Sequence, residues 1–318
     1  MRILAWHVHA AWMTSFVQGP HEYYVPVLPD RSADGKGRAQ TYDWPDTVRE
    51  ITPEALRTTD LDVVLLQRPC EVELFARWAG RALGRHGVPA VYVEHNTPRG
   101  DVAEWKHPLA ARADVPIVHV TEFNRTVWDN GIAPAFVIEH GVPDHGYGYV
   151  GDDDSLVAAI NEPVRRWRVA GTDLVARVTE QVPVSVYGMG TAELPARIPG
   201  LARVDDLSQA ELHERMGRHF GYLHPYRWTS LGLSLIEAMM LGLPVLAVGA
   251  TAAYEAVPPE AGLVSAAPDR LIETAQRWRR DPAEARARGQ AARAHALRQF
   301  GLTRFLDDWD GLLKEVCR

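Results

Sequence analysis

The chain has 318 residues, of which 46% are hydrophobic, and its formal net charge is -7. This length and apolar content suffice for one or two well-packed domains, and two is our expectation. The acidic balance offers no broad basic surface for nucleic acid, and no stretch of about 20 residues is apolar enough to span a membrane. The first residues lack the layout of a signal peptide, and Cys70 and Cys317 make no disulfide framework, so we expect a cytoplasmic protein.

Short apolar runs alternate with longer helical patterns along the whole chain. The runs do not alternate between apolar and polar residues, which is typical of parallel strands buried on both faces. Two of the helical patterns cover Val72–His86 and Thr121–Asn130. The sequence therefore predicts a doubly wound α/β architecture, with strands at Arg2–Val8, Tyr24–Leu28, Val63–Gln67, Ala90–Glu94, Ile117–Val120, Ala135–Ile138, Val184–Tyr187, Gly221–Leu223, Val245–Val248 and Leu263–Ser265.

The strand and helix pattern occurs twice, which predicts two domains. The connector, roughly residues 140–154, is rich in Gly, Asp and Pro. We place an N-terminal domain at residues 1–145 and a C-terminal domain at residues 146–300. Residues 301–318 read as a final helix that carries Phe305, Leu306, Trp309 and Leu312 on one face.

The most informative stretch, from Tyr222 to Val248, reads as strand, loop, helix and strand. A loop that leads into a helix N-terminus presents free backbone N–H groups and the positive end of the helix dipole, which suits a phosphate. Glu237 lies in the otherwise apolar helix that follows Gly232, and a carboxylate there suits the two hydroxyls of a ribose. The stretch therefore predicts a nucleotide site.

The same residues resemble the donor site of retaining glycosyltransferases of the GT-B fold, family 4-like, also called group 1. Leu231-Gly232 is similar to the F-G inside the family's E-x7-E signature, Glu237 to its second Glu, and residues 238–245 to the tail that follows. The first Glu of the signature falls on Thr229, which is a departure. The resemblance implies two Rossmann-like domains that face a central cleft, a C-terminal helix that packs back on the N-terminal domain, and sugar transfer from a nucleotide sugar. It also implies that Thr229, Ser230, Leu231, Gly232 and Glu237 line the donor site.

Further motifs support the donor half of this resemblance. The family clamps the donor diphosphate with an Arg and a Lys before a Gly-x-Asp, and Gly171-Thr172-Asp173 matches that tail. The Arg position falls on Arg165 and the Lys position on Ala170, so Arg166 or Arg168 is the candidate for the second charge. Gly188, in a G-x-G turn after a predicted strand, completes the donor-side prediction.

Polar residues near two N-terminal strand ends are the candidates for the acceptor half. Glu94, His95 and Asn96 follow the strand at 90–94, where parallel sheets bind ligands, and resemble the family's polar residues near the donor sugar. His9 and Trp12 follow the first strand. We assign His95, Thr229 and Arg165 to catalysis, and His9, Trp12, Glu94 and Asn96 to the acceptor.

The predicted function is transfer of a sugar from a nucleoside diphosphate sugar to an acceptor hydroxyl, with retention and without a metal ion. Asp152-Asp153-Asp154 reads as a solvated charge run rather than a metal site, and no cofactor is expected beyond the donor substrate. Two alternatives remain at this point. One is a nucleotide-sugar-binding protein with little or no transferase activity, which Thr229 and the missing Lys favour, and the other is a GT-B sugar-nucleotide epimerase.

Overall fold

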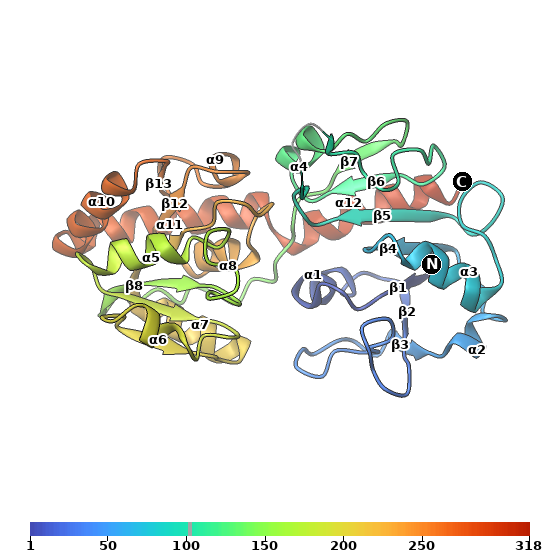
Figure 1. Ribbon diagram of the computed structural model, residues 1–318, viewed down its shortest axis with the longest axis horizontal. Helices are drawn as coiled ribbons and strands as arrows, with labels where there is room; N and C mark the ends of the chain where they lie inside the picture. Colours follow the sequence, from blue (N-terminus) through green and yellow to red (C-terminus); the bar gives the residue numbers. More distant parts are fainter. Residues whose placement is uncertain (101–103) are drawn as a thin grey trace. The chain divides into compact units, whose positions relative to one another are not determined.

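The computed structural model describes residues 1–100 and 104–318, which divide into two compact units (Figure 1). Unit 1 comprises Met1–Val142 together with Leu302–Arg318, and unit 2 comprises Pro143–Gly301. The boundaries between the units lie at 142/143 and 301/302, whereas the sequence analysis places the domain boundaries at 145/146 and 300/301. Each unit contains one parallel sheet with helices packed on it.

Among the described residues of unit 1, seven strands form a parallel sheet in the order β3-β2-β1-β4-β5-β6-β7. The chain runs outward from β1 to β3 and then returns to β4, which pairs with β1. The strand order therefore reverses between β1 and β4, and such a switch point places a crevice outside the carboxyl ends of these two strands. The strands are β1 Arg2–Ala5, β2 Glu22–Pro26, β3 Val48–Ile51, β4 Val63–Leu66, β5 Ala90–Glu94, β6 Ile117–His119 and β7 Ala135–Val137.

The last helix of the chain belongs to unit 1. Its residues Phe305, Trp309, Leu312 and Leu313 are buried, and the ring of Trp309 makes edge contacts with Trp12 and Phe16. This aromatic cluster fastens the C-terminal helix to the first helix of the chain. The helices of unit 1 are α1 Ala10–Phe16, α2 Pro53–Leu56, α3 Glu71–Ala79, α4 Glu122–Val127 and α12 Leu302–Val316.

Unit 2 repeats the order of the first six strands of unit 1, on a six-stranded parallel sheet with the order β10-β9-β8-β11-β12-β13. Here the switch point lies between β8 and β11, which pair with each other. The strands are β8 Asp153–Ala159, β9 Val184–Tyr187, β10 Arg203–Asp205, β11 His219–His224, β12 Val245–Val248 and β13 Gly262–Ser265. The helices are α5 Thr172–Thr179, α6 Leu194–Arg197, α7 Gln209–Arg218, α8 Leu233–Leu241, α9 Ala253–Ala256, α10 Pro268–Arg280 and α11 Pro282–Gln299.

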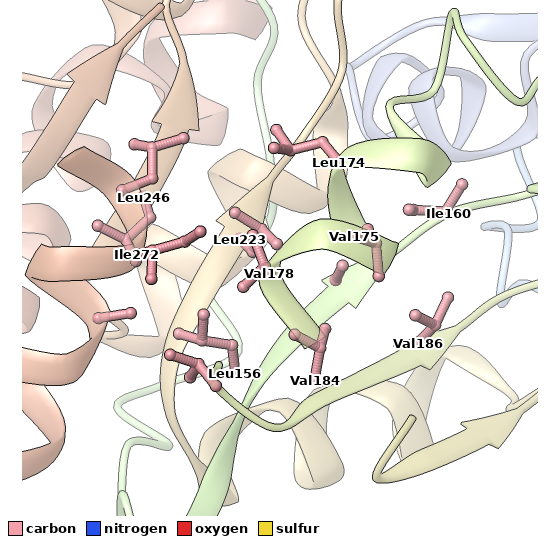
Figure 2. Packing of buried hydrophobic residues seen from close by; sticks show 14 of the residues in the cluster. Leu156, Ile160, Leu174, Val175, Val178, Val184, Val186, Leu223, Leu246 and Ile272 are labelled. Atoms are coloured by element: carbon pink, nitrogen blue, oxygen red, sulfur yellow. The ribbon is translucent and has the colours of Figure 1, made fainter. Parts of the chain in front are cut away.

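Alternate residues of the central strand β8 build the core of unit 2. Leu156 and Ala158 of β8, together with Ile160 just after it, are fully buried in one cluster with residues of α5 and α10 (Figure 2). Side chains of a strand point alternately to its two faces, so this set covers one face of the sheet. Both faces of β8 are buried, which explains why its apolar residues form a continuous run.

The predicted strands all exist, but three further strands, β3, β8 and β10, are not predicted. β8 is missed because it begins inside the acidic run, at Asp153. The structure pairs these carboxylates with arginines: Asp152 with Arg218, Asp153 with Arg203, and Asp154 with Arg279. The run is thus partly exposed, as predicted, but it opens the central strand instead of lying wholly in a linker.

The predicted helix Val72–His86 is too long, because α3 ends at Ala79. Gly80 follows in the left-handed conformation, with φ 65°, and stops the helix as glycine commonly does. Within the described parts of the chain, no helix has the length and apolar character that crossing a membrane requires.

Candidate functional site

The two segments that the sequence singled out in the C-terminal half meet at the switch point of unit 2. One segment follows β8 and contains Arg165–Arg168, and the other follows β11 and leads into α8. The N–H groups of Arg227 and Trp228 donate to the carbonyl of Val169, at 3.0 and 3.4 Å, and thereby join the segments. The donor-side candidates are therefore gathered where an open parallel sheet binds its ligands.

A glycine makes this close approach possible. Gly171 is the N-cap of α5 and has φ 72° and ψ 25°, a left-handed conformation. A Cβ atom at this position would overlap the carbonyl of Pro225, which lies in the other segment. Gly171 thus serves both a backbone turn that favours glycine and a tight contact between the two segments.

The three candidate arginines differ in their surroundings. Arg165 is exposed and its Nε lies 3.3 Å from Glu162, while Arg168 pairs with Asp173. Arg166 lies with its guanidinium 5.4 Å from the ring centre of Tyr226, and within the described residues it has no carboxylate partner. Of the three, Arg166 is therefore the cation with charge left to offer to an anion, and Tyr226 holds it in place.

Sequence reasoning missed Arg227, which lies beside these arginines. Its guanidinium binds Asp173 through two hydrogen bonds, of 2.6 and 2.9 Å. Burial raises the pKa of Asp173, but the arginines Arg227 and Arg168 outweigh this effect, and the net pKa is lowered. One carboxylate thus holds two guanidinium groups, which leaves the cluster with a net positive charge.

The loop before α8 presents the backbone that the sequence predicts for phosphate or sugar. Ser230 and Leu231 are buried, and Gly232 is the N-cap of α8. A Cβ atom on Gly232 would lie 3.0 Å from Cε1 of His224, so the absence of a side chain lets this loop rest on the imidazole. Thr229, just before, is half-buried.

Glu237 is buried, with 8% of its surface exposed, on the second turn of α8. Its Oε1 accepts a hydrogen bond of 3.1 Å from the side-chain amide of Gln209, and its Oε2 lies 3.6 Å from Nε2 of His213. Both neighbours come from α7 and neither was predicted. Because one amide donor occupies only part of the carboxylate's accepting capacity, Glu237 retains lone pairs for a ligand.

Gly188 follows β9 with φ 145°, a conformation that favours glycine. A Cβ atom there would crowd the carbonyl of Ile160, just after β8. The glycine lets the ends of two neighbouring strands approach, which is a packing reason for its presence beside the donor role proposed from the sequence.

In unit 1, the predicted residues after β1 and β5 lie together. The rings of His9 and His95 are 4.0 Å apart, and Trp12 packs edge-on against His95 at 5.0 Å. Burial, with the neighbouring His9 and His140, lowers the pKa of His95 well below its usual value, so this imidazole is neutral at pH 7. A neutral imidazole is able to accept a proton or to hydrogen-bond a hydroxyl.

Glu94 has a structural role that the sequence did not show. Its Oε1 accepts from the backbone N–H of Asn96 at 2.7 Å, and its Oε2 lies 3.2 Å from Nε2 of His107. The N–H of Leu109 donates to Nδ1 of His107, which leaves Nε2 of this ring to donate to Glu94. Glu94 therefore fixes the turn that contains His95, while the exposed Asn96 is better placed to meet a ligand.

Charged residues also line a cavity of about 570 Å³ beside α7, which includes the acidic run and Arg203, Arg215 and Arg218. Most of these charges pair with one another, as described above. Across residues 1–100 and 104–318, no group of three or more His, Cys, Asp or Glu is arranged to hold a metal ion.

The buried histidines predict that unfolding becomes easier as the pH falls from 6.5 towards 4. Burial lowers the pKa of His224 to about 4, and the same cause lowers the pKa of His9 and of His119 to about 4. Between pH 4 and pH 6.5 the unfolded chain binds more protons than the folded one, so the free energy of unfolding falls as the pH falls. Above pH 6.5 these histidines are neutral in both states and the free energy of unfolding keeps its full value. For His224 alone, the loss of unfolding free energy over this pH range amounts to about 3 kcal/mol.

Urea unfolding from about pH 7 to about pH 4.5 tests this expectation. His224→Asn is expected to flatten the pH dependence of the unfolding free energy, whereas His86→Gln, at an exposed position, is expected to leave it unchanged. An identical pH dependence in His224→Asn and the unmodified protein contradicts the prediction.

Comparisons with known proteins show similarity in sequence and in fold. Residues 165–309 match the family described as Glycosyl transferase-like. Sucrose-phosphate synthase from Thermosynechococcus elongatus has a similar structure, with a TM-score of 0.75 and 13% identity over 99% of both chains. HepE from Anabaena in complex with UDP-glucose gives a TM-score of 0.70 with 17% identity over 99% of this chain and 100% of that one.

AviGT4, a glycosyltransferase involved in avilamycin A biosynthesis, gives a TM-score of 0.66 with 14% identity over 100% of this chain and 98% of that one. No curated protein matches the sequence. These likenesses confirm the predicted fold, and the match over residues 165–309 agrees with the resemblance that the sequence analysis drew for this part of the chain. Residues 165–309 are therefore similar to the glycosyl transferase-like family, and the chain has two Rossmann-like domains of the GT-B fold.

Proposed function

We propose that this glycosyltransferase moves a hexose from a UDP-sugar to an acceptor hydroxyl, with retention and without a metal ion. The observation that carries the proposal is Glu237, a buried carboxylate on α8 with accepting capacity left for a ribose. HepE has been solved with UDP-glucose, which makes UDP-hexoses the first donors to test.

The donor belongs to unit 2 in this proposal. Glu237 accepts hydrogen bonds from the ribose hydroxyls, and backbone N–H groups of the 230–232 loop face phosphate or sugar. Arg166, held by Tyr226, supplies the positive charge for the diphosphate, because Arg165 and Arg168 already have carboxylate partners. Thr229 contacts the donor sugar, and Gly188 keeps the neighbouring turn close to β8.

The acceptor belongs to unit 1. His95, neutral and tilted against the ring of His9, hydrogen-bonds the reacting sugar or acceptor, and the exposed Asn96 contacts the acceptor. Trp12, which the sequence analysis assigned to the acceptor, is buried and supports His95 by packing edge-on against it. Retention requires attack from the face that the diphosphate leaves, and the leaving phosphate itself takes the acceptor's proton. The protein then contributes orientation of the substrates and stabilisation of the charge on the leaving group.

Thermal shift with nucleoside diphosphates and their sugars tests the donor role first. A ligand at 100 times its dissociation constant adds about 2.7 kcal/mol of stability, which gives a clear rise in melting temperature. We expect UDP and UDP-hexoses to stand out over the GDP, ADP, CDP and dTDP series. Failure of every nucleotide to shift the folded protein removes the proposal.

Product analysis then separates transfer from the alternatives. Release of UDP that depends on an added acceptor indicates transfer, and UDP release without one indicates an epimerase or hydrolase. Binding without turnover across a broad acceptor panel supports a nucleotide-sugar-binding protein, the outcome that Thr229 in place of a Glu favours.

A further inference from the structure

A carboxylate alone does not satisfy a ribose. Each ribose hydroxyl has one proton to donate and lone pairs that accept, whereas Glu237 in its ionised form only accepts. A complete ribose site therefore needs a donor beside the carboxylate. We propose that His213 of α7 is this donor. Its Nε2–H donates a hydrogen bond to the oxygen of a ribose hydroxyl, and the same hydroxyl donates a hydrogen bond to Glu237. The inference rests on the nucleotide-binding function proposed above.

The position of His213 carries the inference. Its side chain is 9% exposed, and its Nε2 lies 3.6 Å from Oε2 of Glu237, just beyond hydrogen-bond distance. Within the described residues, this buried nitrogen has no hydrogen-bond partner. A buried polar atom without a partner is uncommon in a folded protein, and one that is aimed at a ligand-binding carboxylate indicates a group that the ligand completes.

Gln209 and His213 stand four residues apart on α7, so they share one face of the helix, which packs on α8. Gln209 donates to Oε1 of Glu237 at 3.1 Å, which orients the carboxylate. The Oε2 atom is left for the ligand, and His213 lies on that side. The two oxygens of one carboxylate therefore have different neighbours, one already bonded and one still open.

Both ends of α7 are anchored, which fixes the position of His213. A capping box between Ser208 and Glu211 closes the N-terminal turn. At the other end, the carbonyl of Gly217 accepts from the N–H groups of Val150 and Gly151, at 2.8 and 3.2 Å. A Cβ atom on Gly217 would overlap the carbonyl of Gly148, so the helix end packs directly on this backbone.

The segment that anchors α7 also holds the imidazole. His145 lies in it, and its ring centre is 4.4 Å from that of His213. The N–H groups of Gly148 and Tyr149 donate to the carbonyl of Leu241 at the end of α8, both at 3.0 Å. Residues 145–151 thus connect α7 to α8, and within this segment the ring of His145 lies against that of His213.

Binding of UDP, 2′-deoxy-UDP and 3′-deoxy-UDP, measured by calorimetry, tests this role. His213→Leu removes the donor and keeps an apolar side chain in the buried position. We expect it to weaken UDP binding about three- to tenfold, as for one hydrogen bond to a neutral hydroxyl. We also expect it to bind the analogue that lacks the contacted hydroxyl as well as the unmodified protein does. His213→Gln, which restores a donor, is expected to recover part of the loss.

The control is Glu214→Gln, a change at an exposed neighbour on the same helix, which is expected to bind all three nucleotides normally. Equal weakening of UDP and both deoxy analogues by His213→Leu indicates a packing role and overturns the inference. So does an unchanged preference for UDP in a folded His213→Leu variant. Failure of the unmodified protein to bind any nucleoside diphosphate removes the proposed function itself, and the two failures are thus distinguished.

Discussion

Glu237→Ala is expected to weaken UDP binding by roughly 1.5–3 kcal/mol, about 10- to 150-fold, the usual value of hydrogen bonds to a charged group. The structure supports the large effect, because the carboxylate is buried and has Gln209 as its one hydrogen-bonded side chain among the described residues. Little water competes with a ligand at such a site. Calorimetric titration with UDP measures the change.

Two controls accompany this measurement. Glu273→Ala removes an exposed carboxylate on α10 and is expected to leave UDP affinity unchanged. Circular dichroism and the melting temperature establish that Glu237→Ala is folded, since the change also leaves the Gln209 amide without its partner. Unchanged affinity in the folded variant would falsify the ribose role of Glu237.

Gly171→Ala is expected to destabilise unit 2 by about 2–5 kcal/mol. The left-handed conformation costs an alanine about 1–2 kcal/mol. The remainder comes from the added Cβ atom, which meets the carbonyl of Pro225 and forces the backbone to move, with a cost similar to that of overpacking. Denaturant unfolding of the variant measures the loss.

Gly80→Ala is the matched control for this change. Gly80 has nearly the same backbone conformation, with φ 65° and ψ 20°, and a Cβ atom there meets nothing within 4 Å. The Gly80→Ala variant is expected to show only the loss of stability that comes from the left-handed backbone conformation. Equal losses at Gly80 and Gly171 would show that the contact with Pro225 is unimportant. Because Pro225 precedes Tyr226, which holds Arg166, we also expect weaker UDP binding in Gly171→Ala.

Local sequence signals account for most of the fold. The helix after Gly232 was predicted and runs over Leu233–Leu241, because Gly232 and Gly242 delimit an apolar run. Strands such as Ala90–Glu94 were predicted because they are short apolar runs. The strand β8 was missed because its first residues are charged, and their arginine partners come from distant parts of unit 2.

Some features of the candidate site could also be predicted from the sequence, and others only from the structure. The sequence by itself determined the family motif, the doubly wound pattern and the buried Glu237, since each depends on residues close together in the chain. Only the tertiary structure decided which arginine lacks a carboxylate partner, that Glu94 supports its own turn, and that Gln209 and His213 adjoin Glu237. Gln209 precedes Glu237 by 28 residues, and they meet because α7 packs on α8. Such contacts depend on how whole elements pack, which no short pattern along the chain specifies.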